Sequence, residues 1–443
     1  MGSNGIGFVA KSGASVLPLY DKLPHGRHGL APEAVRANQR ARIFGATVEL
    51  VNARGYATTT VQDIVTAANV SKRTFYDLFG NKEDCFLWVF DVIAGRAIRR
   101  VNEAYRAENE WSDQLRSGFA VFVQEVIDEP AAARLALVEA LGAGPVLLKR
   151  MDSASAVFER MVRTSFDAAP DRVELPSIIA KGIVGGISRV VRQRLVEDRI
   201  DELPGIADEL LAWTLTYKSP AARTIGACPI VVGAPRATLG PPRDDREALM
   251  QSAAQIAARH GYERLASDWV VRDAGVSVDV FDEHFPGGTR ECFLAALDHL
   301  GTMLAATAVG QAQAVDGDWP ARVHAGLRAI LEEIARDSVF ARLAFIEVFA
   351  AGPDGIAVRS QVMRRLSDLL LDEEMPVASR EVVAEAIVGA VWQIAHQVVW
   401  KGTMRSLPAL ADIAAYIVLA PSLGGEQAAQ HIRAAAAPPS PTG

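Results

Sequence analysis

The sequence predicts an all-α protein, because apolar residues recur at the spacing of a helical face and no useful alternating strand pattern is present. Near the N-terminus this face consists of Ile43, Ala46, Thr47, Leu50 and Val51. Later in the chain it consists of Leu249, Ala253, Ile256 and Ala257. The 443 residues amount to about three domains of ordinary size, so we expect more than one domain.

One stretch of sequence occurs twice, which indicates a tandem duplication. Arg54-Gly55-Tyr56 recurs as His260-Gly261-Tyr262. Further matches pair Ala68-Asn69-Val70-Ser71 with Ala274-Gly275-Val276-Ser277, Phe75 and Phe79 with Phe281 and Phe285, Cys85-Phe86 with Cys292-Phe293, and Arg134–Pro145 with Arg342–Pro353. The offset stays between 204 and 208 residues, so we interpret the chain as a unit of about 200 residues written twice.

The repeat and the composition together predict the domain boundaries. Gly-rich and Pro-rich stretches mark the arm, the linker and the tail, and a short β-like piece, Pro229–Val232, interrupts the linker. The expected segments are a mobile arm (1–35), a helix-turn-helix domain (36–96), a helical regulatory domain (97–217), a linker (218–243), a degenerate helix-turn-helix domain (244–304), a second helical regulatory domain (305–421) and a disordered tail (422–443).

A helix-turn-helix is predicted just after the Gly55-Tyr56 pair. Thr60 and Asp63 have the spacing of a capping box, which predicts a helix starting at Val61. Asn69 tolerates the left-handed backbone of a turn, and Ser71 is a suitable cap for a second helix. The outward face of that second helix carries Lys72, Arg73, Thr74 and Tyr76. Such a face suits contacts with phosphates and base edges, although a plain helical hairpin with a solvated charged face gives the same spacing.

The segment GYATTTVQDIVTAANVSKRTFYDLFGNKEDCF resembles the DNA-binding domain of the TetR family of bacterial transcriptional repressors, and the resemblance is dense over residues 36–96. The resemblance implies that Lys82, at the start of the fourth helix, contacts phosphate. It also implies that Thr59, Thr60, Arg73, Thr74 and Tyr76 face DNA. Lys72 or Arg73 is the better candidate for reading a base, while the other contacts position the protein.

The charge distribution separates the two copies. The whole chain has a net charge of −7, which by itself argues against a nucleic-acid partner. Residues 36–82 nevertheless hold 7 basic and 3 acidic residues, whereas residues 243–289 hold 5 basic and 9 acidic. The second copy replaces the cationic face with Val278, Asp279, Val280 and Asp282. Because phosphates repel such a face, we expect the second helix-turn-helix not to bind DNA. The alternative is a degenerate reader that still works.

The resemblance further implies that each helical domain binds a small effector and dimerises through its last two long helices. These correspond to residues 175–197 with 205–217, and to residues 380–401 with 409–419. Pairing of the two copies within one chain would make an intrachain pseudo-dimer. Gly182, Gly185, Gly186 and Gly389 either allow close helix approach there or are ordinary small residues in buried helices.

The function expected from the sequence is a DNA-binding transcriptional regulator, a repressor that a small-molecule effector releases from double-stranded DNA. Effector binding would shift the fourth helix, about residues 82–100. A single reader covers one half-site, so we expect two chains to meet on a palindromic operator. The alternative is a DNA-independent ligand-binding or protein-interaction module, which the acidic second copy favours. Trp392, His396 and Trp400 share one helical face that forms either a pocket wall or a core stripe.

Other classes of protein are not expected. The sequence has no nucleophile elbow, phosphate-binding glycine loop or metal-ligand spacing, so we expect no enzyme, cofactor or metal site. Charge or glycine breaks the apolar runs, which argues against a membrane span, and no secretion signal opens the chain. We therefore expect a cytoplasmic protein. Its three cysteines, Cys85, Cys228 and Cys292, are too scattered for a disulfide framework.

Overall fold

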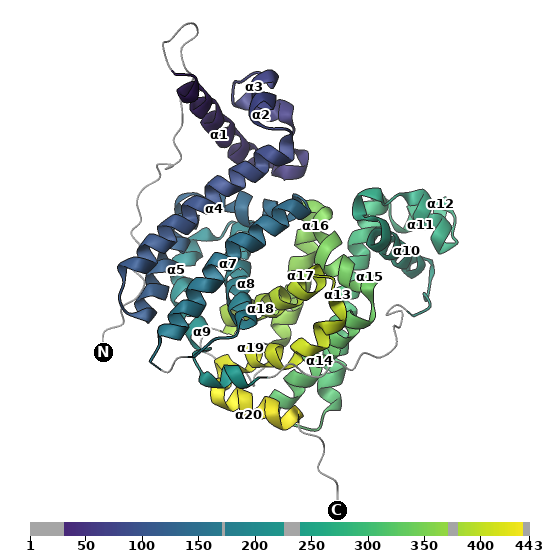
Figure 1. Ribbon diagram of the computed structural model, residues 1–443. Helices are drawn as coiled ribbons and strands as arrows, with labels where there is room; N and C mark the ends of the chain where they lie inside the picture. The colour runs from purple at the N-terminus through teal and green to yellow at the C-terminus, as the bar shows by residue number, and fades with distance from the viewer. Residues whose placement is uncertain (1–30, 171–172, 226–239, 371–379, 437–443) are drawn as a thin grey trace, which may run out of the picture. The chain divides into compact units, whose positions relative to one another are not determined.

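The computed structural model describes residues 31–170, 173–225, 240–370 and 380–436, and every regular element in these ranges is a helix (Figure 1). The predicted all-α class is therefore confirmed over the described residues. The chain divides into two compact units. The first comprises residues 1–158 and 191–208, and the second comprises residues 159–190 and 209–443. The β-like piece expected at Pro229–Val232 lies outside the described residues.

The first unit begins with the helix-turn-helix domain. Its elements are α1 (Pro32–Thr58), α2 (Val61–Ala67), α3 (Lys72–Leu78), α4 (Lys82–Ala107), α5 (Trp111–Asp128), α6 (Pro130–Leu137), η1 (Glu139–Gly142) and η2 (Ile200–Glu202). Three further helices each have residues assigned to both units: α7 (Pro145–Ala168), α8 (Ser177–Val196) and α9 (Leu203–Leu215). The core under α1 to α4 contains Ile43, Ile64, Phe75 and Phe79, each with at most 4% of its surface exposed.

The second unit repeats that order of elements. Its helix-turn-helix elements are α10 (Asp245–His260), η4 (Tyr262–Arg264), α11 (Ser267–Ala274), α12 (Val278–His284) and α13 (Gly288–Ala314). These are followed by α14 (Trp319–Arg336), α15 (Ser338–Arg342), the π-helix η5 (Leu343–Glu347), α16 (Val348–Ala350), α17 (Gly352–Leu370), α18 (Arg380–Trp400), η6 (Met404–Leu410), α19 (Ala411–Leu423) and α20 (Gly425–Ala436).

Glycines bring α8 and α18 into close contact within the second unit, where Figure 1 places the two helices side by side. A Cβ atom added at Gly186 would lie 2.5 Å from the carbonyl oxygen of Ala386. One added at Gly389 would lie 3.1 Å from the Cα of Gly186 and would also meet Arg189. Close approach is therefore the reason for these glycines, and ordinary tolerance of small residues does not account for them.

A second contact joins the segments that follow these helices. The Tyr217 hydroxyl donates a hydrogen bond of 2.8 Å to the carbonyl oxygen of Ile417 on α19, and the Tyr217 side chain is fully buried. The rings of Tyr217 and Tyr416 lie 6.2 Å apart. Burial raises the pKa of Tyr217 well above its ordinary value, so this hydroxyl stays a donor. Residues near 217 and near 417 of one chain thus share one core.

Three helical stretches are long and apolar enough to cross a membrane by length and composition alone, and the expected absence of a membrane span stays a prediction. They are Gly288–Ala314, Glu381–Trp400 and Met404–Leu423. Between 44% and 67% of each window is buried against other helices of the second unit, which gives the apolar side chains a partner within the protein.

The expected disordered tail is wrong for residues 425–436, which form α20. Ala428, Ala429 and Ile432 on this helix are each at most 3% exposed. A Cβ atom added at Gly425 would lie 2.7 Å from the Tyr416 hydroxyl and would also meet Ser219. An alanine-rich sequence is a good helix former, and burial of one apolar face stabilises it here. The start of the expected linker is ordered as well, as the short helix η3 (Pro220–Thr224).

Candidate DNA-binding interface

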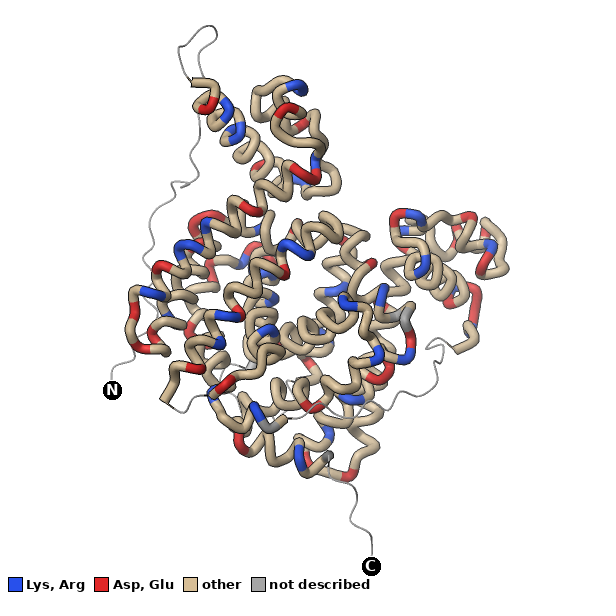
Figure 2. The backbone as a smooth tube through the Cα atoms, in the orientation of Figure 1, with Lys and Arg blue, Asp and Glu red and all other residues tan. Residues whose placement is uncertain are grey.

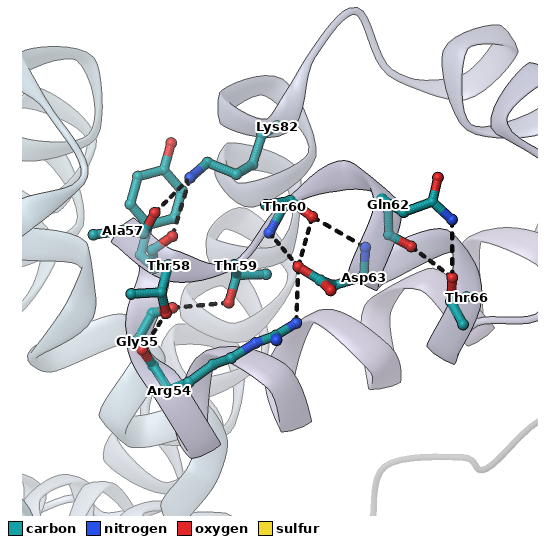
Figure 3. Close-up of polar contacts among 11 residues, drawn as sticks. Arg54, Gly55, Ala57, Thr58, Thr59, Thr60, Gln62, Asp63, Thr66 and Lys82 are labelled. Carbon is teal, nitrogen blue, oxygen red and sulfur yellow. Dashed lines mark hydrogen bonds and ion pairs between the residues drawn. The ribbon is translucent and has the colours of Figure 1, made fainter.

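The helix-turn-helix is held by the caps that its sequence predicts. The Thr60 hydroxyl accepts a hydrogen bond of 3.2 Å from the Asp63 amide, and the Asp63 carboxylate accepts one of 2.9 Å from the Thr60 amide. Arg54 forms an ion pair of 2.9 Å with the same carboxylate, as Figure 3 shows. The hydrogen bonds from Thr60, and then Arg54, lower the pKa of Asp63 to about 2. The cap therefore stays charged through the physiological range of pH.

The second helix presents the predicted cationic face. Asn69 adopts φ 52°, the left-handed turn expected of it, and the Ser71 hydroxyl accepts a hydrogen bond of 3.0 Å from the Thr74 amide at the start of α3. Phe75 points into the core with no exposed surface. On the other side, Lys72 and Arg73 are exposed, and Tyr76 has 56% of its surface exposed. Since a large aromatic side chain is seldom left so open, this face is available to a partner.

The structure corrects the assignment of Thr59. Its side chain is 1% exposed, and its hydroxyl donates a hydrogen bond of 2.8 Å to the carbonyl oxygen of Gly55. A buried hydroxyl with this partner closes the turn between α1 and α2, so the Thr59 side chain is not at the surface that the resemblance implied. The neighbouring Thr58 is exposed, although the sequence did not single it out.

Lys82 contacts the turn between α1 and α2 in this structure. Its amine donates a hydrogen bond of 3.0 Å to the carbonyl oxygen of Tyr56 and lies 4.1 Å from the centroid of the Tyr56 ring. Figure 3 shows this amine directed toward the loop that precedes α2. Partial burial lowers its pKa. Lys82 thus ties the start of α4 to the entrance of the helix-turn-helix.

Glu139, which the sequence analysis did not single out, contacts this turn from the helix η1. The Glu139 carboxylate, on η1, accepts a hydrogen bond of 2.9 Å from the Tyr56 amide. Gly55 beside it has φ 81°, and a Cβ atom there would lie 3.1 Å from the same carboxylate oxygen. The second unit repeats the arrangement with Glu347, whose carboxylate lies 3.0 Å from the Tyr262 amide after Gly261 at φ 89°.

Replacing Glu139 with glutamine is expected to weaken DNA binding about tenfold, because a charged acceptor becomes a neutral one at the turn that leads into the predicted DNA-binding helices. The measurement is a titration of operator DNA followed by fluorescence anisotropy. Glu347→Gln is the matched control, because it weakens the same interaction in the second unit, together with the 3.0 Å ion pair between Glu347 and Arg342, and should leave DNA affinity unchanged. Equal losses in both variants would contradict a specific role for Glu139.

The second helix-turn-helix keeps the skeleton of the first and differs at its surface. Gly275 adopts φ 73°, and the Ser277 hydroxyl caps α12. The two rings below it, Phe281 and Phe285, lie 5.9 Å apart, against 5.5 Å between Phe75 and Phe79 in the first helix-turn-helix. Ala266 gives α11 no side-chain cap. Figure 2 shows the contrast between Lys and Arg on α3 and Asp and Glu on α12.

Other reactive groups are buried or dispersed. Burial raises the pKa of the Cys85 and Cys292 thiols to about 12, so both stay protonated, whereas Cys228 lies outside the described residues. The buried His324 forms a contact of 2.8 Å with Asp412. Within the described ranges, no three His, Cys, Asp or Glu side chains are grouped to hold a metal ion.

Comparisons with known proteins agree with this geometry. Residues 43–89 match the sequence model described as "Bacterial regulatory proteins, tetR family". The HTH-type transcriptional regulator EthR of Mycolicibacterium smegmatis is 26% identical over 204 residues, covering 44% of this chain and 90% of that protein.

Solved structures of regulators match part of the chain with low overall similarity. FadR of Bacillus subtilis in complex with stearoyl-CoA is 20% identical over 39% of this chain and 96% of its own, with a TM-score of 0.36. FadR of Bacillus halodurans is 18% identical over 40% of this chain and 94% of its own, with a TM-score of 0.38. The family model covers residues 43–89, which span the helix-turn-helix described above, so it is this segment that is similar to the bacterial regulatory proteins of the tetR family.

Proposed function

We propose that this protein is a sequence-specific, ligand-responsive transcriptional repressor whose single DNA reader is the helix-turn-helix of the first copy. The observation that supports the proposal is the exposed face of α3, which presents Lys72, Arg73 and Tyr76. Ser71 caps this helix, and Phe75 packs it against the core. A net charge of +4 over residues 36–82 favours contact with phosphates. The proposed DNA contacts are Thr60, Lys72, Arg73, Thr74, Tyr76 and Lys82.

We propose that the chain arose by tandem duplication and pairs its two regulatory domains as an intrachain pseudo-dimer. Support comes from the recurrence of one loop architecture, in which a glutamate accepts the backbone amide of Tyr56 or Tyr262. Further support comes from the packing of Gly186 against Ala386 and the hydrogen bond from Tyr217 to Ile417. In an ordinary homodimer the same helices of two subunits meet in an isologous interface, and the proposed pseudo-dimer would pair α8 with α18 in the same way.

The acidic surface of the second motif limits each chain to one half-site. Asp279 and Asp282 are both exposed on α12, where phosphates would repel them. Because a half-site gives little specificity, we propose that two chains bind a palindromic operator together. We further propose that the protein acts in the cytoplasm and has no membrane partner. A measurement of the mass of the DNA complex tests this stoichiometry, and one chain per operator at full affinity would contradict it.

The proposed function is tested by titrating DNA from the region upstream of the gene with wild type, Arg73→Ala and Tyr76→Ala. Arg73→Ala is expected to bind about 5- to 150-fold more weakly, the loss that corresponds to one base contact. Tyr76→Ala is expected to bind more weakly as well, because it removes a contact that positions the protein on DNA. Asp279→Ala and Asp282→Ala, at the matching positions of the second copy, are the controls and should not weaken binding. Unchanged affinity in Arg73→Ala and Tyr76→Ala would overturn the assignment of these residues.

The second candidate is a DNA-independent ligand-binding or protein-interaction module, which the acidic face of α12 favours. It differs from the repressor in its response to salt. A repressor with several phosphate contacts loses affinity steeply between low and moderate salt, and the logarithm of its affinity falls linearly with the logarithm of the salt concentration. A module that does not bind DNA shows no such dependence in the same titration, so one salt series separates the two candidates.

A further inference from the structure

The second unit contains a cavity of about 410 Å³ between α13, α14, α17 and α18. Its wall is formed almost entirely by aliphatic and aromatic side chains, among them Leu304, Ile330, Phe345 and Val391. Five lining residues carry a polar side-chain atom, and none of them is acidic: Gln313, Trp319, Arg322, Arg359 and Trp392. A volume within the range of small-molecule sites, with few polar groups, is the pattern of a ligand pocket.

The polar side chains that line the cavity leave most of its inner surface apolar. Gln313 is exposed, and Arg322 donates a hydrogen bond of 3.2 Å to the carbonyl oxygen of Gly317. The guanidinium of Arg359, a residue 7% exposed, lies 4.6 Å from the centroid of Trp392. Phe345 stacks on the same indole at 4.1 Å. Aromatic faces therefore accompany this cation, which reduces its demand for an anionic ligand.

Trp392 thus settles one question that the sequence left open. It lines the cavity, whereas His396 and Trp400 do not, although their rings lie 6.1 Å apart on the same helix. Of the three residues on this helical face, Trp392 therefore belongs to the pocket wall, and His396 and Trp400 belong to a packing face outside it. The matching positions of the first copy, 208 and 204 residues earlier, hold Met151 and Ser188 in place of Arg359 and Trp392. The pair of cation and indole therefore belongs to the second copy.

We propose that this cavity binds the effector, and that the effector is a small uncharged molecule made mostly of hydrocarbon. The inference rests on the proposed function for its regulatory meaning, while ligand binding itself is independent of DNA. The two copies would then have different roles. The first copy binds DNA, and the second copy, whose DNA-binding face is lost, binds the ligand. A wall of aliphatic side chains binds hydrocarbon by removing it from water, so affinity should grow with apolar surface.

The experiment uses the full chain and the uncharged fluorescent probe N-phenyl-1-naphthylamine, displaced by 1-alkanols from six to ten carbons. Affinity is expected to rise about fourfold for each added methylene, the gain that corresponds to burying one such group. Decanoate, of the same length as 1-decanol, should bind at least tenfold more weakly. An affinity independent of chain length, or tighter binding of decanoate, would overturn the proposed class of ligand.

A cavity-filling variant localises the binding. Val391→Trp, whose side chain enters the cavity, should lose probe and alkanol binding, and Val398→Trp is the control on the same helix outside the lining. If Val391→Trp does not fold, the alkanol series on wild type still tests the proposed class of ligand. Binding that survives in a folded Val391→Trp would overturn the site. If wild type binds operator DNA and no alkanol, this inference alone fails; if no DNA binds, the proposed function fails.

Discussion

Replacing Phe75 with alanine is expected to lower the free energy of unfolding of the first unit by about 3 to 5 kcal/mol and to abolish DNA binding. Phe75 is fully buried, and its ring lies 5.5 Å from the rings of both Tyr76 and Phe79. Loss of the ring leaves a cavity beneath α3, and this helix has only 7 residues with which to hold its orientation. Urea denaturation followed by circular dichroism measures the stability, and DNA titration measures the binding.

Phe281→Ala is the matched control for Phe75→Ala. Phe281 is 1% exposed, packs 5.9 Å from Phe285, and occupies the corresponding place under α12. The loss of stability should therefore be similar. Because the proposed function gives the second motif no contact with DNA, affinity for the operator should be retained. If the two variants lost DNA binding equally, the idea of one working reader and one silent motif would be wrong.

Replacing Gly186 with valine is expected to lower the free energy of unfolding of the second unit by about 1 to 3 kcal/mol. Even a single Cβ atom at this position would lie 2.5 Å from the carbonyl oxygen of Ala386 and 2.6 Å from the Trp213 ring. A backbone oxygen cannot turn aside, so α8 and α18 must separate. The measurement is the midpoint of urea denaturation of the full chain.

Gly310→Ala is the control for Gly186→Val. An added Cβ atom at Gly310 meets nothing within 4 Å, and the residue lies inside α13. Alanine should stabilise this helix by about 0.5 to 1 kcal/mol, because glycine loses more conformational freedom on folding. A destabilised Gly310→Ala, or an unchanged Gly186→Val, would show that the close approach of the helices is not what these glycines provide.

The local structure of the reader was predictable, because its signals lie within a few residues of one another. Thr60 and Asp63 are three positions apart and cap α2, and Ser71 caps α3 in the same way. The left-handed turn at Asn69 follows from the tolerance of its side chain for that backbone. The close contact of α8 with α18 was one of two alternatives, since glycine patterns do not distinguish contact from tolerance.

Features that depend on distant parts of the chain were missed. Glu139 lies 83 residues from Tyr56, and a carboxylate that accepts a backbone amide leaves no periodic pattern. Thr59 stands beside Thr60 and differs from it only in burial, which a motif comparison does not show. The helix α20 was missed because alanine-rich sequence is also typical of a loose tail, and only the partners of Ile432 decide between the two.

The hydrogen bond between Tyr217 and Ile417 has a consequence for how the protein behaves on dilution. It joins residues 200 positions apart in one polypeptide, so its formation is a first-order process. An interface between separate subunits weakens as protein becomes scarce, whereas this one has the same occupancy at one molecule per cell as at a thousand. Under the proposed function, a regulator made in very few copies would keep its core assembled, and only the proposed binding of two chains to DNA would depend on abundance.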